Sequence, residues 1–164
     1  MKFISFEDIL NLKILPGCCV KWAEEVIKMK KDCELPPKIS IKFGDEHNSF
    51  FNTMPSLIPA LNRFGMKEVS RLPQREPALK ADILLYDTLS GDLLTLMDGT
   101  WITTMRTGAV AAITIDKLQK KDTKVISFMG LGNTARATLL CYNSIINNKD
   151  LNIALLKYMM MVMK

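Results

Sequence analysis

The first 37 residues carry two helical patterns separated by a short break. Ser5 followed by two acidic residues predicts a capped helix that ends near Leu12. Pro16 opens a longer helix, and Pro36 and Pro37 end it, because proline cannot continue a helix. Apolar residues recur at helical spacing along this second helix and predict one buried stripe. The stripe consists of Val20, Ala23, Val26 and Ile27.

From residue 38 onward the apolar period shortens to two, which is typical of strands. Residues 39–43 alternate between apolar and polar side chains and predict a half-buried strand. Pro55 is expected to end the next strand, and a turn at 98–99 is expected to lead into another extended segment at 101–103. The other short strands of this antiparallel-rich α+β segment are predicted at 50–54, 65–70, 83–86 and 93–97, the last two joined as a hairpin.

The chain then returns to a helical pattern. Thr103 or Thr104 is expected to cap a helix that runs to about Lys120. Small residues around Gly108 give this helix a face that permits close packing against another element. A short apolar strand is predicted at 125–129, directly before a pair of glycines.

These glycines belong to a sequence of the form G-x-G-x-x-A, placed between a predicted strand and a predicted helix. Gly130 permits a tight turn, Gly132 lets backbone N–H groups approach a pyrophosphate, and Ala135 permits close contact of helix and strand. A second strand predicted at 151–156 completes the spacing of a βαβ unit. The pattern predicts a dinucleotide-binding site, and a glycine-rich turn without a ligand is the alternative.

The acidic residue that binds a ribose hydroxyl in this pattern is missing at the end of the second predicted strand. Lys157 stands near that position, and Asp150 precedes the strand instead. We therefore hypothesise that Lys157 faces an adenosine 2′-phosphate, so that NADP binds at least as well as NAD. A solvated lysine is the alternative.

Arg106 lies in the first turn of the predicted helix, where the helix dipole disfavours a cation. An arginine there fits an anion that the helix end also attracts, such as a carboxylate or a phosphate. A partner in Asp98, or simple solvation, is the alternative. Lys38 and Lys67, each at a predicted strand, are candidates for the same anion, although strand lysines commonly face water.

The amino-acid composition limits which ligands, metal sites and cellular compartment are expected for this protein. The 164 residues, 48% of them apolar, fit one globular domain, or one domain with part of a second. The net charge of +5 comes from scattered basic residues, which suits a small anionic ligand better than a nucleic acid. One histidine and no C-x-x-C pair among four cysteines argue against a metal site and for reduced thiols in the cytoplasm. Neither an apolar stretch of membrane-spanning length nor a signal peptide is expected.

The residues match a known family in two separate motifs. The first is Leu-Met-Asp-Gly-Thr-Trp-Ile-Thr-Thr-Met-Arg-Thr-Gly-Ala-Val at 96–110, and the second is the glycine sequence at 130–135. Together with shorter matches at 37–39, 52–55 and 65–67, these motifs mean that the chain resembles the ornithine cyclodeaminase/mu-crystallin family from about residue 5 to residue 157.

The resemblance implies an α/β protein, with an α+β N-terminal substrate and dimerisation domain at 1–121 and the first βαβ unit of a Rossmann dinucleotide-binding domain at 122–164. It implies an NAD-dependent enzyme, with NADP as the alternative cofactor. Such an enzyme abstracts a hydride from the α-carbon of a small amino acid and forms an imine before deamination or cyclisation. A ketimine reductase or amino-acid dehydrogenase of the same family is one alternative, and a non-catalytic nucleotide-binding and dimerisation module of the mu-crystallin type is another. A homodimer is implied for the full-length protein, with no nucleic-acid or membrane partner.

The resemblance also assigns roles to single residues. Arg106 and Lys67 would hold the substrate carboxylate, and Met54 would line the pocket. Lys38 stands where the family commonly has arginine, and Asn52 stands where the cyclodeaminase has a glutamate that polarises the reacting groups, which argues against ornithine as the substrate. The substrate-binding residues are thus Lys38, Met54, Lys67 and Arg106, and the cofactor-binding residues are Arg106, Thr107, Gly130, Gly132, Asn133, Thr134 and Ala135.

The end of the chain departs from a complete nucleotide domain. The part after Gly130 has room for about one βαβ unit, whereas a doubly wound domain needs two βαβαβ halves. The catalytic aspartate of the family belongs to the second half. Together with the methionine-rich end at 159–164, this predicts a partial chain that is inactive by itself. A stand-alone protein whose methionine tail packs on the N-terminal core is the alternative.

Overall fold

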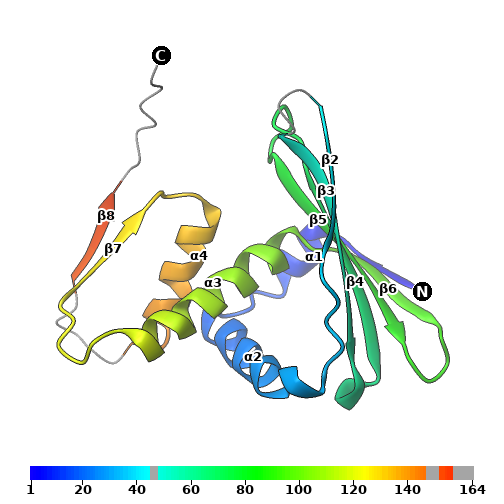
Figure 1. The fold of residues 1–164 in the computed structure, drawn as a ribbon, viewed down its shortest axis with the longest axis horizontal. Helices are drawn as coiled ribbons and strands as arrows, with labels where there is room; N and C mark the ends of the chain where they lie inside the picture. Colours follow the sequence, from blue (N-terminus) through cyan, green and yellow to red (C-terminus); the bar gives the residue numbers. More distant parts are fainter. Residues whose placement is uncertain (45–47, 147–151, 157–164) are drawn as a thin grey trace. The chain divides into compact units, whose positions relative to one another are not determined.

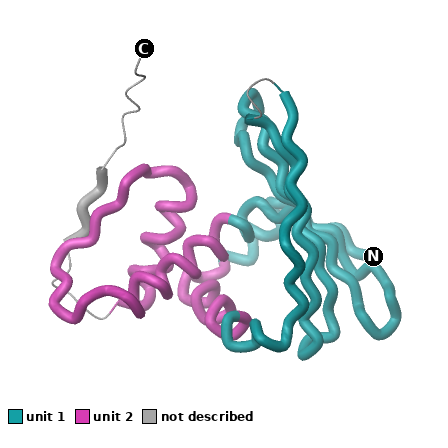
Figure 2. Tube along the Cα trace, viewed as in Figure 1, with its two compact units in different colours: residues 1–13, 27–103 teal, residues 14–26, 104–164 magenta. Residues whose placement is uncertain are grey.

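The computed structural model describes residues 1–44, 48–146 and 152–156. The chain forms two compact units, one made of residues 1–13 and 27–103 and the other of residues 14–26 and 104–164 (Figure 2). Helices α2 (Pro16–Met29) and α3 (Thr100–Leu118) run continuously from one unit into the other. The predicted domain boundary at residue 121 remains a prediction.

The first unit is built on a six-stranded mixed sheet with the order β1-β6-β5-β4-β3-β2 (Figure 1). Strand β1 pairs parallel with β6, and all other neighbours are antiparallel. The five strands predicted between residues 39 and 97 are confirmed in place, and most are longer than predicted, whereas β1 was not predicted. The strands are β1 (Lys2–Ile4), β2 (Ile39–Phe43), β3 (Ser49–Ile58), β4 (Arg63–Arg71), β5 (Leu79–Asp87) and β6 (Leu93–Asp98).

Short helical elements accompany this sheet: α1 (Phe6–Asn11), η1 (Lys30–Asp32) and η3 (Pro59–Leu61). The predicted cap of α1 is confirmed. The backbone N–H of Asp8 donates to the Ser5 hydroxyl at 3.1 Å, and the Ser5 N–H donates to the Asp8 carboxylate at 2.8 Å. The bonds from the backbone and hydroxyl of Ser5 lower the pKa of Asp8. This reciprocal cap satisfies donors that a helix start otherwise leaves unpaired.

Strand β3 continues through Pro55, so the predicted end at this proline is wrong. The N–H and C=O of Leu57 both pair with Glu34 on the side of the strand where β2 lies. Pro55 points to the same side, because it precedes Leu57 by two residues. Strand β2 begins opposite Thr53 and does not reach Pro55, so the missing proline N–H removes no ladder hydrogen bond.

Strand β2 is exposed along its whole length, so the predicted half-burial is wrong. Ile39 and Ile41 expose 62% and 64% of their surface. The second half of the apolar stripe on α2 is also exposed, at Val26 and Ile27, whereas Val20 is buried. Periodicity identifies the side chains that share a face, but burial requires another element against that face.

The second unit contains parts of α2 and α3 together with β7 (Val125–Met129), α4 (Asn133–Asn143) and β8 (Asn152–Leu156). Strands β7 and β8 pair in parallel with α4 between them in sequence, which confirms the predicted βαβ spacing (Figure 1). The phenol of Tyr142, which is fully buried, donates a hydrogen bond to Gln119 at 2.9 Å. The other buried side chains include Ala109, Ala112, Ala137 and Cys141.

Helix α3 begins at Thr100, so the predicted extended segment at 101–103 and the predicted cap at residue 103 or 104 are wrong. The N–H of Thr100 donates to the Asp98 carboxylate at 2.7 Å, and the Thr103 N–H donates to the Gly99 carbonyl at 2.7 Å. A Cβ on Gly99 would lie 2.9 Å from Ile83, so the tight junction requires glycine. This packed junction overrides the strand preference of the aromatic and β-branched residues that follow it.

Helices α3 and α4 approach closely at Gly108, as the small-residue face predicted. A Cβ at Gly108 would lie 2.5 Å from the carbonyl carbon of Ala137, which leaves no room for a side chain. Both Gly108 and Ala137 are buried. Backbone-to-backbone contact of this kind allows the two helices to pack without an intervening layer of side chains.

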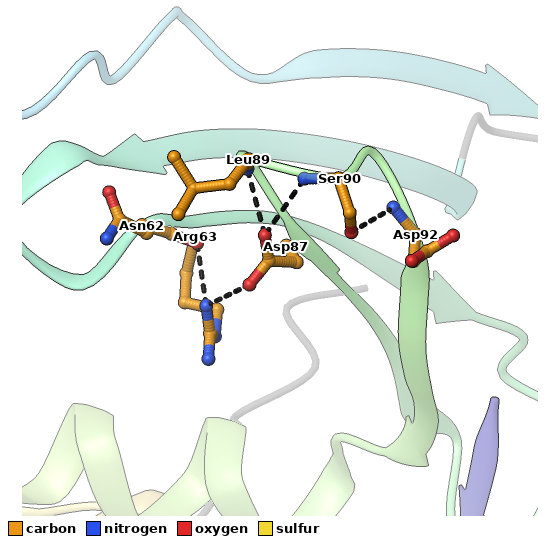
Figure 3. Close-up of polar contacts among 6 residues, drawn as sticks. All are labelled: Asn62, Arg63, Asp87, Leu89, Ser90 and Asp92. Carbon is orange, nitrogen blue, oxygen red and sulfur yellow. Dashed lines mark hydrogen bonds and ion pairs between the residues drawn. The ribbon is translucent and has the colours of Figure 1, made fainter.

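The loop between β5 and β6 is organised around the carboxylate of Asp87 (Figure 3). One carboxylate oxygen accepts the backbone N–H groups of Leu89 and Ser90, at 2.8 and 3.1 Å, and the other accepts the Arg63 guanidinium at 2.8 Å. The bonds from Leu89 and Ser90, followed by the charge of Arg63, lower the pKa of Asp87. The turn therefore prefers the ionised carboxylate.

Replacement of Gly108 by alanine is expected to lower the free energy of unfolding by roughly 1–3 kcal/mol, because backbone atoms must shift to admit the methyl group. Urea denaturation of wild type and variant measures the change. Gly132→Ala is the matched control, because no atom lies within 4 Å of its Cβ position and its φ of −71° suits alanine. Equal midpoints for the two variants would contradict the close α3–α4 contact.

Asp87→Asn is expected to weaken the acid dependence of folding. The lowered pKa means that ionised Asp87 stabilises the fold above the ordinary aspartate value near pH 4, and this stabilisation is lost as the pH falls through the lowered value. Urea midpoints at neutral and acidic pH for wild type and variant measure the effect. Asp92→Asn is the control, because the Asp92 carboxylate accepts no hydrogen bond from the described residues. An unchanged acid dependence in Asp87→Asn would show that the turn has no preference for the carboxylate.

Candidate functional site

The connection from β7 to α4 is the predicted glycine loop. Gly130 has φ of +88°, a conformation that side-chain-bearing residues rarely adopt, so the tight turn predicted there is confirmed. Gly132 is the N-cap of α4 in extended conformation. No atom lies within 4 Å of the Cβ position of either glycine. The space beside both backbones is therefore open.

The first turn of α4 faces this space with unused donors. The N–H groups of Asn133, Thr134 and Ala135 donate no hydrogen bond to the described residues, and no side chain caps the helix. Asn133 and Thr134 are exposed, and Ala135 is half-buried. Free amides and the positive end of a helix dipole favour an anion. An open backbone surface beside them suits a bulky anion such as a pyrophosphate.

Arg106 lies in the second turn of α3, because the helix begins at Thr100. The predicted placement in the first turn is wrong, and with it the argument that the helix dipole disfavours this cation. Arg106 is exposed, and its guanidinium has no hydrogen-bond or ion-pair partner among the described residues. Partial desolvation by neighbouring protein lowers the pKa of Arg106, but the group stays charged at neutral pH. It is available to an anionic ligand.

Arg106 and the glycine loop belong to the same unit. Arg106 precedes Gly108 by two residues, and Gly108 contacts Ala137 of α4. Ala137 lies about 7.5 Å along the helix axis from Gly132, at a rise of about 1.5 Å per residue. The α3–α4 contact thus places Arg106 and the half-buried Thr107 on the helix that packs beside the start of α4.

In the first unit, the sheet brings together the predicted substrate residues Met54 and Lys67. They are direct register partners on β3 and β4, and both are half-buried. Lys38 is exposed and lies one residue before β2, whose first residue pairs with Thr53. The three side chains therefore belong to adjacent positions of neighbouring segments, although they are far apart in the sequence.

Asn52 lies two residues before Met54 on β3 and is 9% exposed. Its side-chain carbonyl is buried and has no hydrogen-bond partner among the described residues. A buried polar group without a partner costs roughly 1–3 kcal/mol, so it calls for an explanation. In the sequence, only the family resemblance points to Asn52, because the alternation of β3 does not show that this position is buried and lacks a partner among the described residues.

The cysteines have no arrangement typical of a metal centre. No group of three or more histidine, cysteine, aspartate or glutamate residues in the described part of the chain could hold a metal ion. Cys141 is fully buried, and burial raises the pKa of its thiol to about 11, so it remains protonated at neutral pH. Within residues 1–44, 48–146 and 152–156, no helix has the length and apolar character needed to cross a membrane. The Lys157 hypothesis, Asp150 and the methionine-rich end fall outside the described residues.

Comparison with known proteins decides the family. A family model described as ornithine cyclodeaminase/mu-crystallin matches residues 4–157. The chain belongs to this family. A curated member, a Delta(1)-pyrroline-2-carboxylate reductase of Bacillus cereus, is 30% identical over 105 residues, which cover 62% of this chain and 32% of that protein.

Two solved structures share the fold of this chain and are longer than it. The Delta(1)-pyrroline-2-carboxylate reductase of Thermococcus litoralis, in complex with NADH and L-proline, matches with 26% identity and a TM-score of 0.81 over 96% of this chain and 57% of its own. An archaeal alanine dehydrogenase dimer with bound NAD matches in fold, with 24% identity and a TM-score of 0.82 over 93% of this chain and 47% of its own. The chain thus spans about half the length of these solved relatives.

Proposed function

We propose that this chain supplies the dinucleotide-binding loop and part of the substrate site of an NAD-dependent enzyme that transfers hydride to or from the α-carbon of a small amino or imino acid. The open glycine loop at the start of α4 carries the proposal, because it combines a backbone free of side chains with unused N–H donors. The hydride transfer is proposed for the whole protein. NADP is the alternative to NAD as the cofactor.

The dinucleotide fits the residues present. Gly130 and Gly132 leave space for the pyrophosphate, and the amides of residues 133–135 would bind its oxygens. When bound, the nicotinamide would accept a hydride from the substrate α-carbon or donate one to it. A guanidinium can bind a phosphate or a carboxylate, so we assign Arg106 to both the cofactor and the substrate. We assign the neighbouring Thr107 to the cofactor.

The proposed substrate-binding residues are those that the family resemblance and their side-chain charges indicate. Lys67 and Arg106 would hold the carboxylate, Met54 would contribute an apolar wall, and Lys38 would add positive charge. A nucleotide-binding module without catalysis would share the cofactor loop but would not need the amino-acid site.

Gly132→Val is expected to weaken the binding of NADH at least tenfold, because the branched side chain would occupy the space of the pyrophosphate. The fold should tolerate it, since nothing lies within 4 Å of the Cβ position. Fluorescence titration with NADH gives the affinity, and circular dichroism gives the melting temperature. Leu140→Val, at an exposed position farther along α4, is the control. Undiminished NADH affinity in Gly132→Val, or no NADH binding by the wild type, would overturn the proposal.

We further propose that the exposed apolar face of β2 and β3 binds a second copy of the chain, in line with the archaeal relative described as a dimer. Register places Ile41 beside Phe51, and the rings of Phe43 and Phe51 stack with centroids 5.8 Å apart. With Ile39, these residues form an apolar surface of the kind that is covered in oligomers.

Ile41→Asp is expected to raise the dimer dissociation constant at least tenfold, because the interface would then bury an unpaired charge. Analytical ultracentrifugation over a range of concentrations measures the equilibrium. Lys42→Asp introduces the same side chain at the next residue of β2, which faces the other side of the sheet, and should leave the dimer intact. A monomeric wild type, or equal effects of the two variants, would refute this face as the interface.

A further inference from the structure

Arg136 is the only charged residue of α4, and it lies near the end of the helix where a cation is least favourable. The first turn of α4 holds no acidic residue, and the last turn holds no basic one. The N-terminal end of a helix dipole is positive, so it repels a guanidinium and attracts an anion. The single charge of α4 is thus placed against the dipole of its own helix.

The guanidinium of Arg136 is not compensated by any protein group in the described part of the chain. Arg136 is exposed, and its side chain forms no hydrogen bond or ion pair with the described residues. Its backbone N–H donates to the Gly132 carbonyl at 3.1 Å, which closes the first turn of the helix. Arg136 therefore directly follows the three residues, 133–135, whose N–H groups donate no hydrogen bond to the described residues.

The helical position of Arg136 directs its side chain toward the open glycine loop. The Cα–Cβ bond of a helical residue tilts toward the helix N-terminus, so a long side chain covers the preceding turn. Arg136 lies about 6 Å along the helix axis from Gly132, which is close to one turn. It shares the solvent-facing side of α4 with Asn133, three residues earlier, whereas the buried residues Thr138 and Cys141 lie on the other side.

We propose that Arg136 binds the pyrophosphate of the dinucleotide and neutralises its charge beside the amides of the glycine loop. This inference rests on the proposed function. A pyrophosphate diester carries two negative charges, whereas backbone N–H groups offer hydrogen bonds without a net charge. A guanidinium supplies a full positive charge together with paired donors for phosphate oxygens.

A bound pyrophosphate explains why Arg136 stands against the helix dipole. Without the anion, the guanidinium and the positive helix end repel each other, so this arginine destabilises the free protein relative to a neutral side chain. With the anion bound, both attract the same group. Removal of this charge should therefore weaken binding without lowering the stability of the free protein, a combination that a purely structural residue would not produce.

The test uses NADH and ADP-ribose, which share the pyrophosphate, whereas only NADH has the nicotinamide. Fluorescence titration for NADH and calorimetric titration for ADP-ribose give the dissociation constants. Arg136→Gln should weaken both ligands by a similar factor of at least fivefold, because both lose the same charge-assisted bonds. The affinity of the wild type should also fall more steeply with added salt than that of the variant.

Lys124→Gln is the matched control, because it removes the same charge from another exposed residue of the same unit. Lys124 directly precedes β7 and lies at the end of the strand away from the glycine loop, about 16 Å from Met129 along the strand. Its side chain has no hydrogen-bond or ion-pair partner among the described residues. Lys124→Gln should keep the wild-type affinity for both ligands.

Thermal melting of the ligand-free protein separates ligand binding from a structural role. Arg136→Glu places a negative charge near the positive helix end, so its melting temperature should equal or exceed that of the wild type. The same carboxylate would repel the pyrophosphate, so the affinity for NADH should fall at least tenfold and further than in Arg136→Gln. A structural residue would instead lower the melting temperature in both variants.

The outcomes distinguish this inference from the proposed function. If the wild type fails to bind NADH, the proposed function fails, and the inference falls with it. If the wild type binds NADH and Gly132→Val weakens that binding, but Arg136→Gln keeps the wild-type affinity for NADH or for ADP-ribose, only the inference is overturned. The same holds if Arg136→Gln and Lys124→Gln lose equal affinity, or if both Arg136 variants melt below the wild type.

Discussion

The close contact of α3 with α4 is the constraint on which the candidate cofactor site depends. Gly108 has no side chain, and its backbone lies against the backbone of Ala137. A larger residue would push the two helices apart and shift the start of α4, where the free amides lie. The same contact relates Arg106 to the glycine loop through two short stretches of rigid helix. A packing feature without chemistry of its own thus positions the groups that we propose bind an anion.

The pleat of the sheet is a second constraint, because it separates side chains between the two faces. Successive side chains alternate between two faces, so Glu68 and Asp82 are kept away from the face that carries Asn52 and Lys67. Register rather than sequence proximity sets this separation. The opposite face carries the exposed apolar residues of β2, which we propose bind a second copy of the chain.

Much of the architecture could be predicted because its signals are local. The Ser5 cap, the turn at Gly130 and the βαβ spacing depend on residues a few positions apart, and each was confirmed. The errors have a common cause. The start of α3, the passage of β3 through Pro55 and the exposure of β2 depend on neighbours far away in the sequence. Arg106 was assigned to the wrong turn because the junction at Gly99 was interpreted as leading into a strand.

By itself, the sequence determined the glycine loop, the small-residue face of α3 and the membership of the chain in its family, because these depend on residue types at fixed spacings. Only the tertiary structure decided that the buried Asn52 carbonyl has no hydrogen-bond partner among the described residues and that Glu68 and Asp82 lie on the other face. The physical reason is that burial and unmet hydrogen bonds are properties of surroundings. Those surroundings come from strands and helices that meet only when the chain folds.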